Sequence, residues 1–235
     1  MKKTTPFYLL FTCMLFLVLV AIAQPGKKIR KADLRRDILV KTDSGNMVLR
    51  LNDSTTLHRD NFIRLVRSDY YRGISFHRVI NGFMIQAGDE KTKPGFDSIR
   101  SKAQYTLPAE IRPELYHKKG VLAAARLGDD VNPQMKSSGV QFYIVQGKVF
   151  DEISLDSVEI NRLKGRKIPE AHRNTYKIQG GAPHLDQQYT IFGELVSGYD
   201  ILDKIAGTKT SGRKGGDRPL VDIRIKEMKM VRRIK

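Results

Sequence analysis

The stretch ISFHRVINGFMIQAGD, residues 74–89, decides the fold. Two short apolar runs in it flank the dipeptide Asn81-Gly82, which is among the strongest signals for a tight β-hairpin turn. The stretch therefore predicts two antiparallel strands. Arg78 interrupts the first run and Gln86 the second. Taken alone, polar residues at such positions are usually solvated, and their apolar neighbours usually belong to a core.

Short strands and few helices are predicted on both sides of this hairpin. Residues 37–42 and 46–52 form a second hairpin pattern, and residues 56–68 carry apolar residues at helical spacing, for which Thr55 or Thr56 provides an N-cap. Further elements are predicted as strands at residues 120–126, 140–147, 188–198 and 219–231 and as a helix at residues 199–206. This pattern favours a mainly antiparallel β-barrel or sandwich.

The chain divides into a polar leader at residues 24–36 and one domain at residues 37–235. Within that domain, residues 151–178 differ in composition, because they are charged and helix-favouring, with apolar residues such as Leu155 on one side. Pro169 suits the start of a second helix. We interpret this segment as a helical insertion between two strands rather than a separate domain.

The N-terminus has the organisation of a secretory signal peptide. Two lysines precede an apolar run at residues 7–22, and Ala21 and Ala23 form an A-x-A motif. This pattern predicts cleavage after Ala23 and export to the periplasm. An uncleaved membrane anchor and a lipidated Cys13 are alternatives, although the apolar run is shorter than the roughly 20 residues that span a bilayer.

The expected mature chain is basic and has no cysteine. The formal net charge is +17, and loss of two lysines with the signal peptide leaves +15. The single cysteine lies in the same peptide, so stability comes from an ordinary core rather than from disulfides. The basic residues are scattered and do not alternate with aromatic residues, which argues against nucleic-acid binding. A solvated surface is the simplest interpretation, and weak contact with an anionic membrane surface is an alternative.

Several catalytic chemistries lack the residues that they require. There is no G-x-S-x-G motif, and no cysteine remains after cleavage to act as a nucleophile. The five histidines show none of the i, i+3 or i, i+4 spacings of a helical metal site; they are His58, His77, His117, His172 and His184. We therefore expect neither a metal nor a cofactor.

The hairpin and the blocks around it resemble the cyclophilins, a family of peptidyl-prolyl cis-trans isomerases. FHRVINGFMIQAGD resembles the family signature, and NFIRLVRSDYYRG, LPAEIRPELYHKKGVLAAAR, SSGVQFYIVQGKVFD and PHLDQQYTIFGELVSGYDILDKIA resemble further blocks in the family's order. The resemblance covers residues 37–231 apart from the insertion. It implies an eight-stranded antiparallel barrel closed by two helices, at residues 56–68 and 199–206.

The resemblance also implies the site residues. Arg78 takes the place of the catalytic arginine. The substrate-binding positions correspond to His77, Phe83, Met84, Gln86, Ala125, Arg126, Gln141, Phe142, Leu185 and Tyr189. Arg126, His184 and Tyr189 stand where many relatives have Asn, Trp and His. The change at Arg126 looks tolerable, but from the change at His184 we expect weak cyclosporin binding, and from the change at Tyr189 an altered preference for the residue before proline.

Isomerase chemistry suits a chain without a nucleophile or a metal. Rotation about an X-Pro bond, opposed by a barrier of about 18–20 kcal/mol, requires the prolyl nitrogen to lose conjugation. A guanidinium can donate to the lone pair that this nitrogen regains only in the transition state. We therefore expect a monomeric exported enzyme that acts on proline-containing polypeptides. A proline-binding or chaperone module with little catalysis is the alternative, which Arg78 disfavours.

Overall fold

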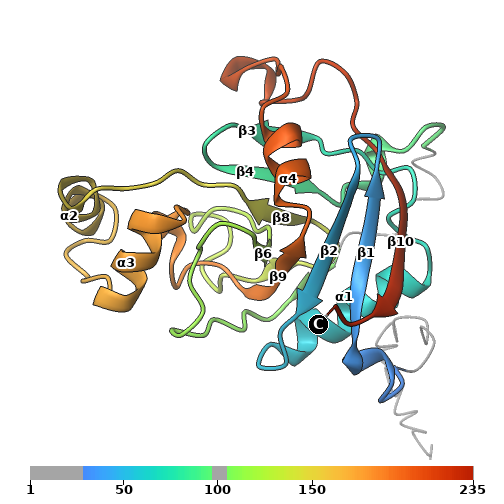
Figure 1. The fold of residues 1–235 in the computed structure, drawn as a ribbon, viewed down its shortest axis with the longest axis horizontal. Coiled ribbons are helices and arrows are strands. Elements are labelled where there is room, and N and C mark those ends of the chain that lie inside the picture. Colours follow the sequence, from blue (N-terminus) through green and yellow to red (C-terminus); the bar gives the residue numbers. More distant parts are fainter. Residues whose placement is uncertain (1–28, 97–104, 235) are drawn as a thin grey trace, which may run out of the picture.

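The computed structural model describes residues 29–96 and 105–234, and the expected signal peptide lies outside them. Eight strands form one antiparallel sheet in the order β10-β1-β2-β9-β6-β8-β4-β3 (Figure 1). Their bounds are β1 Arg36–Thr42, β2 Asn46–Leu51, β3 Arg78–Ile80, β4 Met84–Ala87, β6 Val121–Ala124, β8 Phe142–Val145, β9 Ile191–Ser197 and β10 Ile225–Arg232. The predicted hairpin therefore forms, as β3 and β4.

The sheet curls until its two edge strands approach each other. Backbone hydrogen bonds join the segment before β3 to the start of β10: Gly73 N–H donates to Ile225 O, and Ile225 N–H donates to Ile74 O, each at 2.8 Å. Phe76 N–H likewise donates to Ile223 O at 2.9 Å. Because these bonds pair the exposed edges, the sheet forms a barrel-like structure, and the predicted fold class is confirmed.

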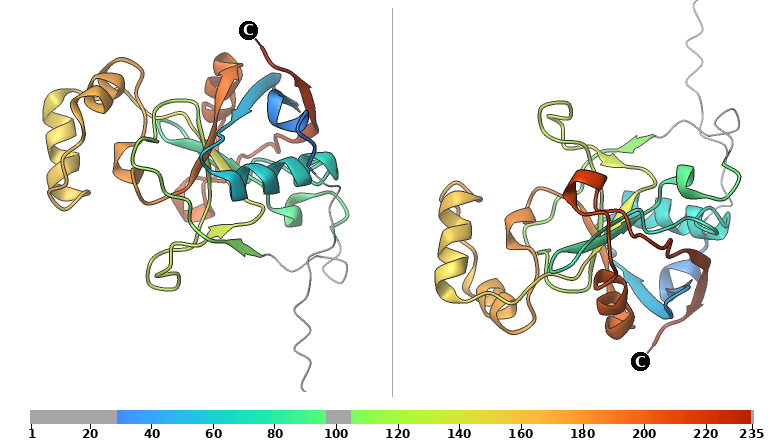
Figure 2. Two further views of the ribbon diagram at one scale, coloured as in Figure 1. Left: turned by 90° about the horizontal axis from the view of Figure 1, so that it is seen from below. Right: turned by 90° about the horizontal axis from the view of Figure 1, so that it is seen from above.

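Two helices cover opposite ends of the curled sheet, as predicted: α1, Thr56–Arg67, and α4, Tyr199–Ala206 (Figure 2). The expected threonine cap of α1 is wrong, since no threonine side chain bonds the helix end. The carboxylate of Glu110 instead accepts the N–H groups of Leu57 and His58 at 3.1 and 2.9 Å. A negative charge at this position also suits the positive end of the helix dipole.

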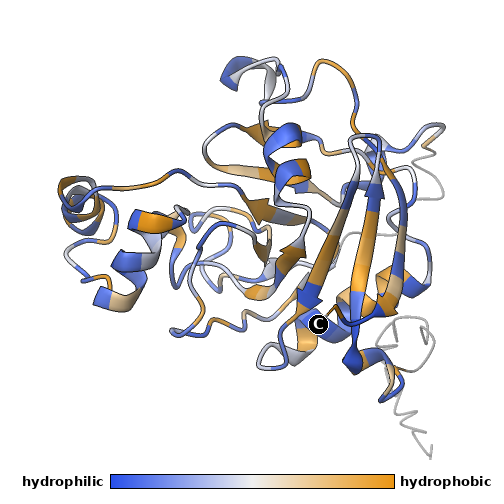
Figure 3. Cartoon of the chain, in the orientation of Figure 1, coloured by the Kyte–Doolittle hydropathy of each residue, from blue (hydrophilic) through white to orange (hydrophobic). Residues whose placement is uncertain are grey.

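The interior of the curled sheet holds the main apolar core. Phe62 from α1 packs edge-on against Phe142 at 5.4 Å between ring centroids and lies 5.2 Å from Tyr71. All three side chains are almost fully buried. Figure 3 shows the corresponding pattern of apolar residues in the strands and polar residues on the exposed helix surfaces. Burial of such aromatic groups is a large source of stability for a chain without disulfides.

Smaller elements depart from the sequence expectation. Strand β10 begins at Ile225 rather than near residue 219, and Val221 is exposed. A separate two-stranded sheet pairs β5 (Thr106–Leu107) with β7 (Ser137–Ser138). Four 3-10 turns occupy Asp33–Arg35, Glu90–Thr92, Pro183–Leu185 (η3) and Arg213–Gly215 among the described residues. Within the same residues, no helix combines the length and apolarity needed to cross a bilayer.

Two helices occupy most of residues 151–178 and lie to one side of the barrel (Figure 1). Helix α2, Glu152–Asn161, begins after Asp151, whose carboxylate accepts Ser154 N–H at 2.8 Å. Helix α3, Glu170–Ile178, begins directly after Pro169, as expected. The helices share a small apolar cluster, formed by Phe150, Leu155, Leu163, Ile168 and Tyr176.

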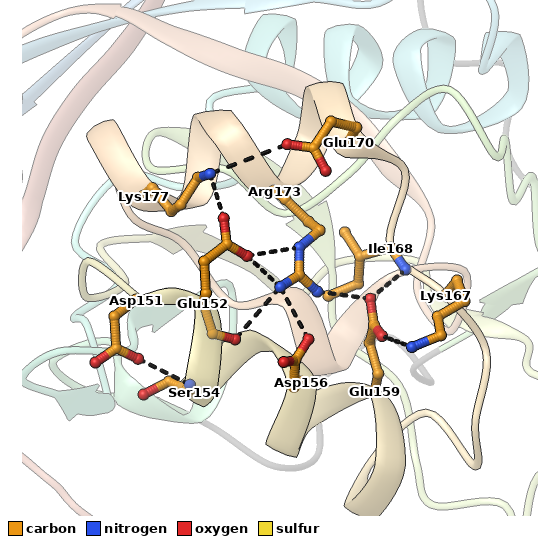
Figure 4. A network of polar contacts seen from close by, with 10 residues as sticks. All are labelled: Asp151, Glu152, Ser154, Asp156, Glu159, Lys167, Ile168, Glu170, Arg173 and Lys177. Atoms are coloured by element: carbon orange, nitrogen blue, oxygen red, sulfur yellow. Dashed lines mark hydrogen bonds and ion pairs between the residues drawn. The ribbon is translucent and has the colours of Figure 1, made fainter.

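A buried arginine joins α2 to α3 (Figure 4). Arg173 on α3 donates to Glu159 at 2.8 Å, to Asp156 at 2.9 Å and to Glu152, all on α2. Burial by itself raises the pKa of Glu159, but hydrogen bonds from Lys167, Ile168 N–H and Arg173 outweigh it and hold the pKa below its ordinary value. The buried charges of Arg173 and Glu159 are therefore compensated by groups within the insertion.

Replacing Arg173 with methionine should release the two helices from each other. The substitution removes every hydrogen bond that Arg173 makes to α2. It should cost less than the roughly 3–5 kcal/mol of a fully uncompensated buried charge, because the buried Glu159 keeps Lys167 and Ile168 N–H as partners. Native-state hydrogen exchange should therefore show much faster exchange of α2 and α3 amides, with little change in β1 or β2.

Lys177→Met is the matched control, since its partner Glu152 is half-exposed and such pairs contribute about 0–1 kcal/mol. Equal acceleration of exchange in both variants would contradict the assignment of Arg173 as the principal link.

Candidate active site

The candidate site lies on the outer face of the sheet, where β3, β4, β8 and β6 run side by side. Arg78 on β3 pairs with Gln86 on β4, and Gln86 pairs with Tyr143 on β8. Tyr143 in turn pairs with Ala123 on β6. These residues form a row across four strands, and because directly opposed residues share a face, their side chains lie on the same side of the sheet.

A pocket of about 190 Å³ opens beside this row. Its lining residues are Arg78, Phe83, Met84, Gln86, Ala125, Arg126, Tyr143, Leu185 and Tyr189. Eight of the eleven residues expected from the sequence are among them; His77, Gln141 and Phe142 are not. Typical small-molecule pockets span about 300–1,000 Å³, so this smaller volume suits one residue of a longer chain.

Aromatic and aliphatic side chains make most of the pocket wall. Met84 and Leu185 belong to an apolar cluster on the outer face of the sheet, against which Phe83 packs. The rings of Tyr143 and Tyr189 meet edge to face, with centroids 5.8 Å apart. A wall of packed rings holds its shape, so the pocket exists before a ligand arrives.

Arg78 lies at the rim of the pocket with 45% of its side chain exposed. Its Nε atom is 3.5 Å from a carboxylate oxygen of Asp217. The Asp217 loop is itself fixed to β3, since Val79 N–H donates to Asp217 O at 2.9 Å. Guanidinium carries five N–H donors, so contact through Nε leaves others to face the pocket.

Gln141 and His77 do not line the pocket but contact Gln86, which does. Gln141 accepts a hydrogen bond from the side-chain amide of Gln86 at 3.1 Å and thereby orients it. The backbone N–H of His77 donates to Gln86 O at 3.1 Å, and its ring Nδ1 is buried without a hydrogen-bond partner among the described residues. Burial lowers the pKa of His77, with a smaller contribution from Arg218 and Arg78, and only Asp89 opposes it, so its ring is neutral near pH 7.

Phe142 does not line the pocket, and its expected place there is wrong. Its side chain is 2% exposed and packs inside the barrel against Phe62 and Tyr71. The next residue, Tyr143, occupies the pocket wall instead. Successive strand residues point to opposite faces, so only one of this pair can reach the site. The alternation of VQFYIV shows that Phe142 and Tyr143 lie on opposite faces of the strand. Both faces are apolar, however, so the sequence did not show which of the two residues faces the pocket.

The hydroxyl of Tyr143 is part of a buried chain of hydrogen bonds. It lies 2.9 Å from His117 Nε2, and His117 Nδ1 lies 3.0 Å from Asp186 Oδ1. Tyr176 on α3 donates to the other oxygen of Asp186 at 2.7 Å. Because a carboxylate only accepts, Nδ1 of His117 carries its proton, and in the neutral ring Nε2 accepts from Tyr143. Burial raises the pKa of Tyr143, so its hydroxyl remains protonated.

Arg126 uses its side chain within the protein. Its guanidinium donates to Gln188 O at 2.8 Å, pairs with Asp129 at 2.6 Å and lies 4.7 Å from the centre of the Tyr189 ring. The side chain is only 4% exposed. The contact over the ring face is a cation–π interaction, which holds Tyr189 in the pocket wall.

A larger depression of about 390 Å³ lies elsewhere, beside β2 and β9. The cations in its lining already have carboxylate partners, because Lys118 pairs with Glu194 at 3.0 Å and both Arg50 and Arg233 pair with Asp37, at 2.9 and 3.8 Å. Across residues 29–96 and 105–234, no group of three or more His, Cys, Asp or Glu residues could bind a metal. The pocket at Arg78 therefore combines an apolar wall with available donors better than this depression does.

Comparisons with known proteins agree on one family. A family model described as cyclophilin type peptidyl-prolyl cis-trans isomerase/CLD matches residues 37–230. A Staphylococcus saprophyticus protein that bears the name of a peptidyl-prolyl cis-trans isomerase is 35% identical over 196 residues, which cover 83% of this chain and 91% of that protein. A Streptococcus pyogenes protein named as a bifunctional phosphatase and isomerase is 36% identical over 197 residues, 82% of this chain but 38% of that protein.

Solved structures show the same relationship. A cyclophilin-type peptidyl-prolyl cis-trans isomerase of Cryptosporidium parvum has a TM-score of 0.58 and 25% identity, covering 83% of this chain and 97% of that one. A structure of the same protein determined in the presence of the dipeptide Ala-Pro has a TM-score of 0.56. With a family model matched over most of its length and an antiparallel barrel like that of these relatives, the chain belongs to the cyclophilin-type peptidyl-prolyl cis-trans isomerases.

Proposed function

We propose that this isomerase catalyses X-Pro rotation in exported polypeptides and assists their folding, with Arg78 as its catalytic residue. The observation that carries the catalytic assignment is the position of Arg78 at the rim of a preformed apolar pocket. The determination of the Cryptosporidium parvum relative in the presence of the dipeptide Ala-Pro supports a proline-containing ligand.

The chemistry follows from the electronic structure of the imide. In the ground state the prolyl nitrogen shares its lone pair with the carbonyl, which gives the C–N bond its double-bond character. Midway through rotation that sharing is lost, and the nitrogen becomes a hydrogen-bond acceptor. An Arg78 N–H that donates to it stabilises the transition state more than the substrate, so the interaction raises the rate rather than the affinity.

One donor cannot supply the whole acceleration. Raising a rate of about 0.01–0.1 s⁻¹ to about 10³ s⁻¹ requires a barrier lower by roughly 5.5–7 kcal/mol. A single preorganised donor contributes about 2.7–4 kcal/mol. We assign the remainder to binding the substrate in a twisted geometry, which demands a firm grip on the proline ring and on the neighbouring backbone.

The pocket offers groups for both tasks. We assign the proline ring to the apolar wall formed by Phe83, Met84, Tyr143, Leu185 and Tyr189. Gln86, oriented by Gln141, is placed to bind a substrate backbone group, and Ala125 and Arg126 complete the lining. None of these steps moves a proton.

The export assignment is supported by the sequence of the N-terminal 23 residues. A basic start, an apolar run and the A-x-A motif that ends at Ala23 together suit a signal peptide. In the periplasm, an isomerase would meet newly exported chains whose X-Pro bonds isomerise in tens to hundreds of seconds without help.

Arg78→Ala should lower kcat/KM for a peptide with one X-Pro bond by about 10²–10³, the usual effect of losing one preorganised donor. Arg78→Lys should recover only part of the loss, because an ammonium lacks the planar fork. Exchange spectroscopy by NMR on the peptide measures both rates without a coupling protease.

Arg213→Ala, which removes an exposed cation outside the pocket, should leave the rate unchanged. If Arg78→Ala were as active as the unchanged protein, a proline-binding module without arginine catalysis would be the better description.

Phe83→Ala should mainly lower activity and Phe142→Ala should mainly lower stability, because the Phe83 ring lines the pocket and the Phe142 ring is buried inside the barrel. Phe142 is buried in the barrel, so its loss should cost about 3–5 kcal/mol of unfolding free energy. Loss of the half-buried Phe83 ring should cost less stability but should lower kcat/KM strongly, since this ring lines the pocket. Urea unfolding together with the exchange assay separates the two effects. A selective loss of activity in a stable Phe142→Ala variant would restore Phe142 to the site.

Expression of the full sequence in a Gram-negative bacterium should yield a periplasmic protein that begins at Gln24. Cleavage after Ala23 removes the first 23 residues, and intact-mass spectrometry of the periplasmic fraction measures the difference directly. A protein of full length in the membrane fraction would favour an uncleaved anchor, and a lipid adduct on Cys13 would favour a lipoprotein.

A further inference from the structure

A second cavity lies next to the proline pocket, between the barrel and α2. Its volume is about 340 Å³. Phe83 and His184 form its side toward the proline pocket, and Phe150 and Val158 form an apolar surface. Lys148, after β8, and Arg162, at the C-terminal end of α2, add two cations to the lining.

The two cavities are adjacent, because Phe83 lines both. The His184 ring lies beside Phe83, with centroids 5.3 Å apart and the planes tilted by 34°. The two cavities therefore meet at Phe83. An extended polypeptide advances about 3.3 Å per residue, so a chain with its proline in the first pocket reaches the second within about two or three residues.

The cavity carries positive charge without internal compensation. Its lining contains no Asp or Glu, and neither Lys148 nor Arg162 forms a salt bridge with any described residue. Lys148 lies 5.3 Å from the centre of the Phe150 ring. The nearby Asp151 is not an ion-pair partner of Lys148, because its carboxylate caps α2 by accepting Ser154 N–H. The hydrogen bonds from Ser154 are the main reason that the pKa of Asp151 is lowered, and Lys148 makes a smaller contribution.

His184 does not add a third charge. Burial, with smaller contributions from Arg162 and His117, lowers the pKa of His184 to about 4. The ring is therefore neutral near pH 7 and presents a polar edge beside the two cations.

The wall supplied by the insertion is held in place at two points. Arg173 joins α2 to α3 through Glu152, Asp156 and Glu159 (Figure 4). The insertion is then fixed to Asp186, directly after η3, since Tyr176 donates to the Asp186 carboxylate and Arg166 donates to Asp186 O, both at 2.7 Å. Arg162 therefore belongs to a folded wall rather than to a loose loop.

From these observations we propose that the cavity between Phe83 and Arg162 is a specificity subsite that binds an acidic side chain of the polypeptide substrate, two or three residues from the proline. The proposal rests on the proposed function, because the substrate is located by its proline in the neighbouring pocket. The aliphatic part of a glutamate would pack on Phe150 and Val158, and its carboxylate would meet Lys148 and Arg162.

The test compares peptide pairs that contain one X-Pro bond and either Glu or isosteric Gln at a single position, from three residues before the proline to three after it. The measured quantity is the ratio of kcat/KM for Glu to that for Gln, at low ionic strength. At one or two positions the Glu peptide should be about two- to fivefold better, through a lower KM, as suits a solvent-exposed ion pair. Salt of about 0.5 M should reduce the preference.

Variants identify the cavity as the origin of the preference. Lys148→Glu and Arg162→Glu should each abolish or invert the Glu/Gln ratio. Lys164→Glu is the matched control, because it makes the same charge change two residues from Arg162 but outside the cavity lining, and its ratio should match that of the unchanged protein. Thermal unfolding of each variant reports whether the fold is retained.

Two results would overturn the proposal. One is equal kcat/KM for Glu and Gln peptides at every position of the unchanged protein; the other is loss of the preference in Lys164→Glu, which would indicate a diffuse field instead of a subsite. Failure of the proposed function would give a different result: the Gln peptides would be turned over no faster by the unchanged protein than by Arg78→Ala.

Discussion

The site depends on the alternation of side chains along an antiparallel ladder. In β3 and β4, Val79 and Ile85 are buried in the barrel core, whereas Arg78 and Gln86 lie opposite each other on the outer face. A slip of one residue would exchange these faces and place a guanidinium in the core, at a cost of many kcal/mol. The apolar interior therefore enforces the register, and the register places the arginine beside the pocket.

The pocket is rigid because apolar groups pack on both faces of the same strands. The barrel interior lies beneath β4 and β8, and a second apolar cluster that includes Met84 and Tyr143 covers their outer face. The buried chain from Tyr143 through His117 and Asp186 to Tyr176 then connects the pocket wall to the insertion. A catalyst that stabilises a brief, twisted geometry benefits from such preorganisation, since little reorganisation remains to be done during rotation.

The insertion extends this arrangement rather than standing apart from it. Its helices have their own apolar cluster and their own buried ion pair between Arg173 and Glu159, and Tyr176 bonds to Asp186, directly after η3. A loop of similar length without such contacts would cost ordering entropy whenever a substrate bound. The helices instead present a folded surface next to Phe83, which forms one wall of the proposed second substrate-binding cavity.

The family motifs pointed to Arg78 and Gln86, which line the pocket. Local sequence was sufficient to predict the hairpin around Asn81-Gly82 and helices within residues 151–178, because turn chemistry and helix preference act over a few residues. It could not distinguish Phe142 from Tyr143, since both faces of β8 are apolar and only packing decides which one faces the core. The Glu110 cap of α1 and the Arg126–Tyr189 contact were likewise decided by tertiary structure. These contacts join residues more than 50 positions apart, whose proximity is a property of the folded sheet alone.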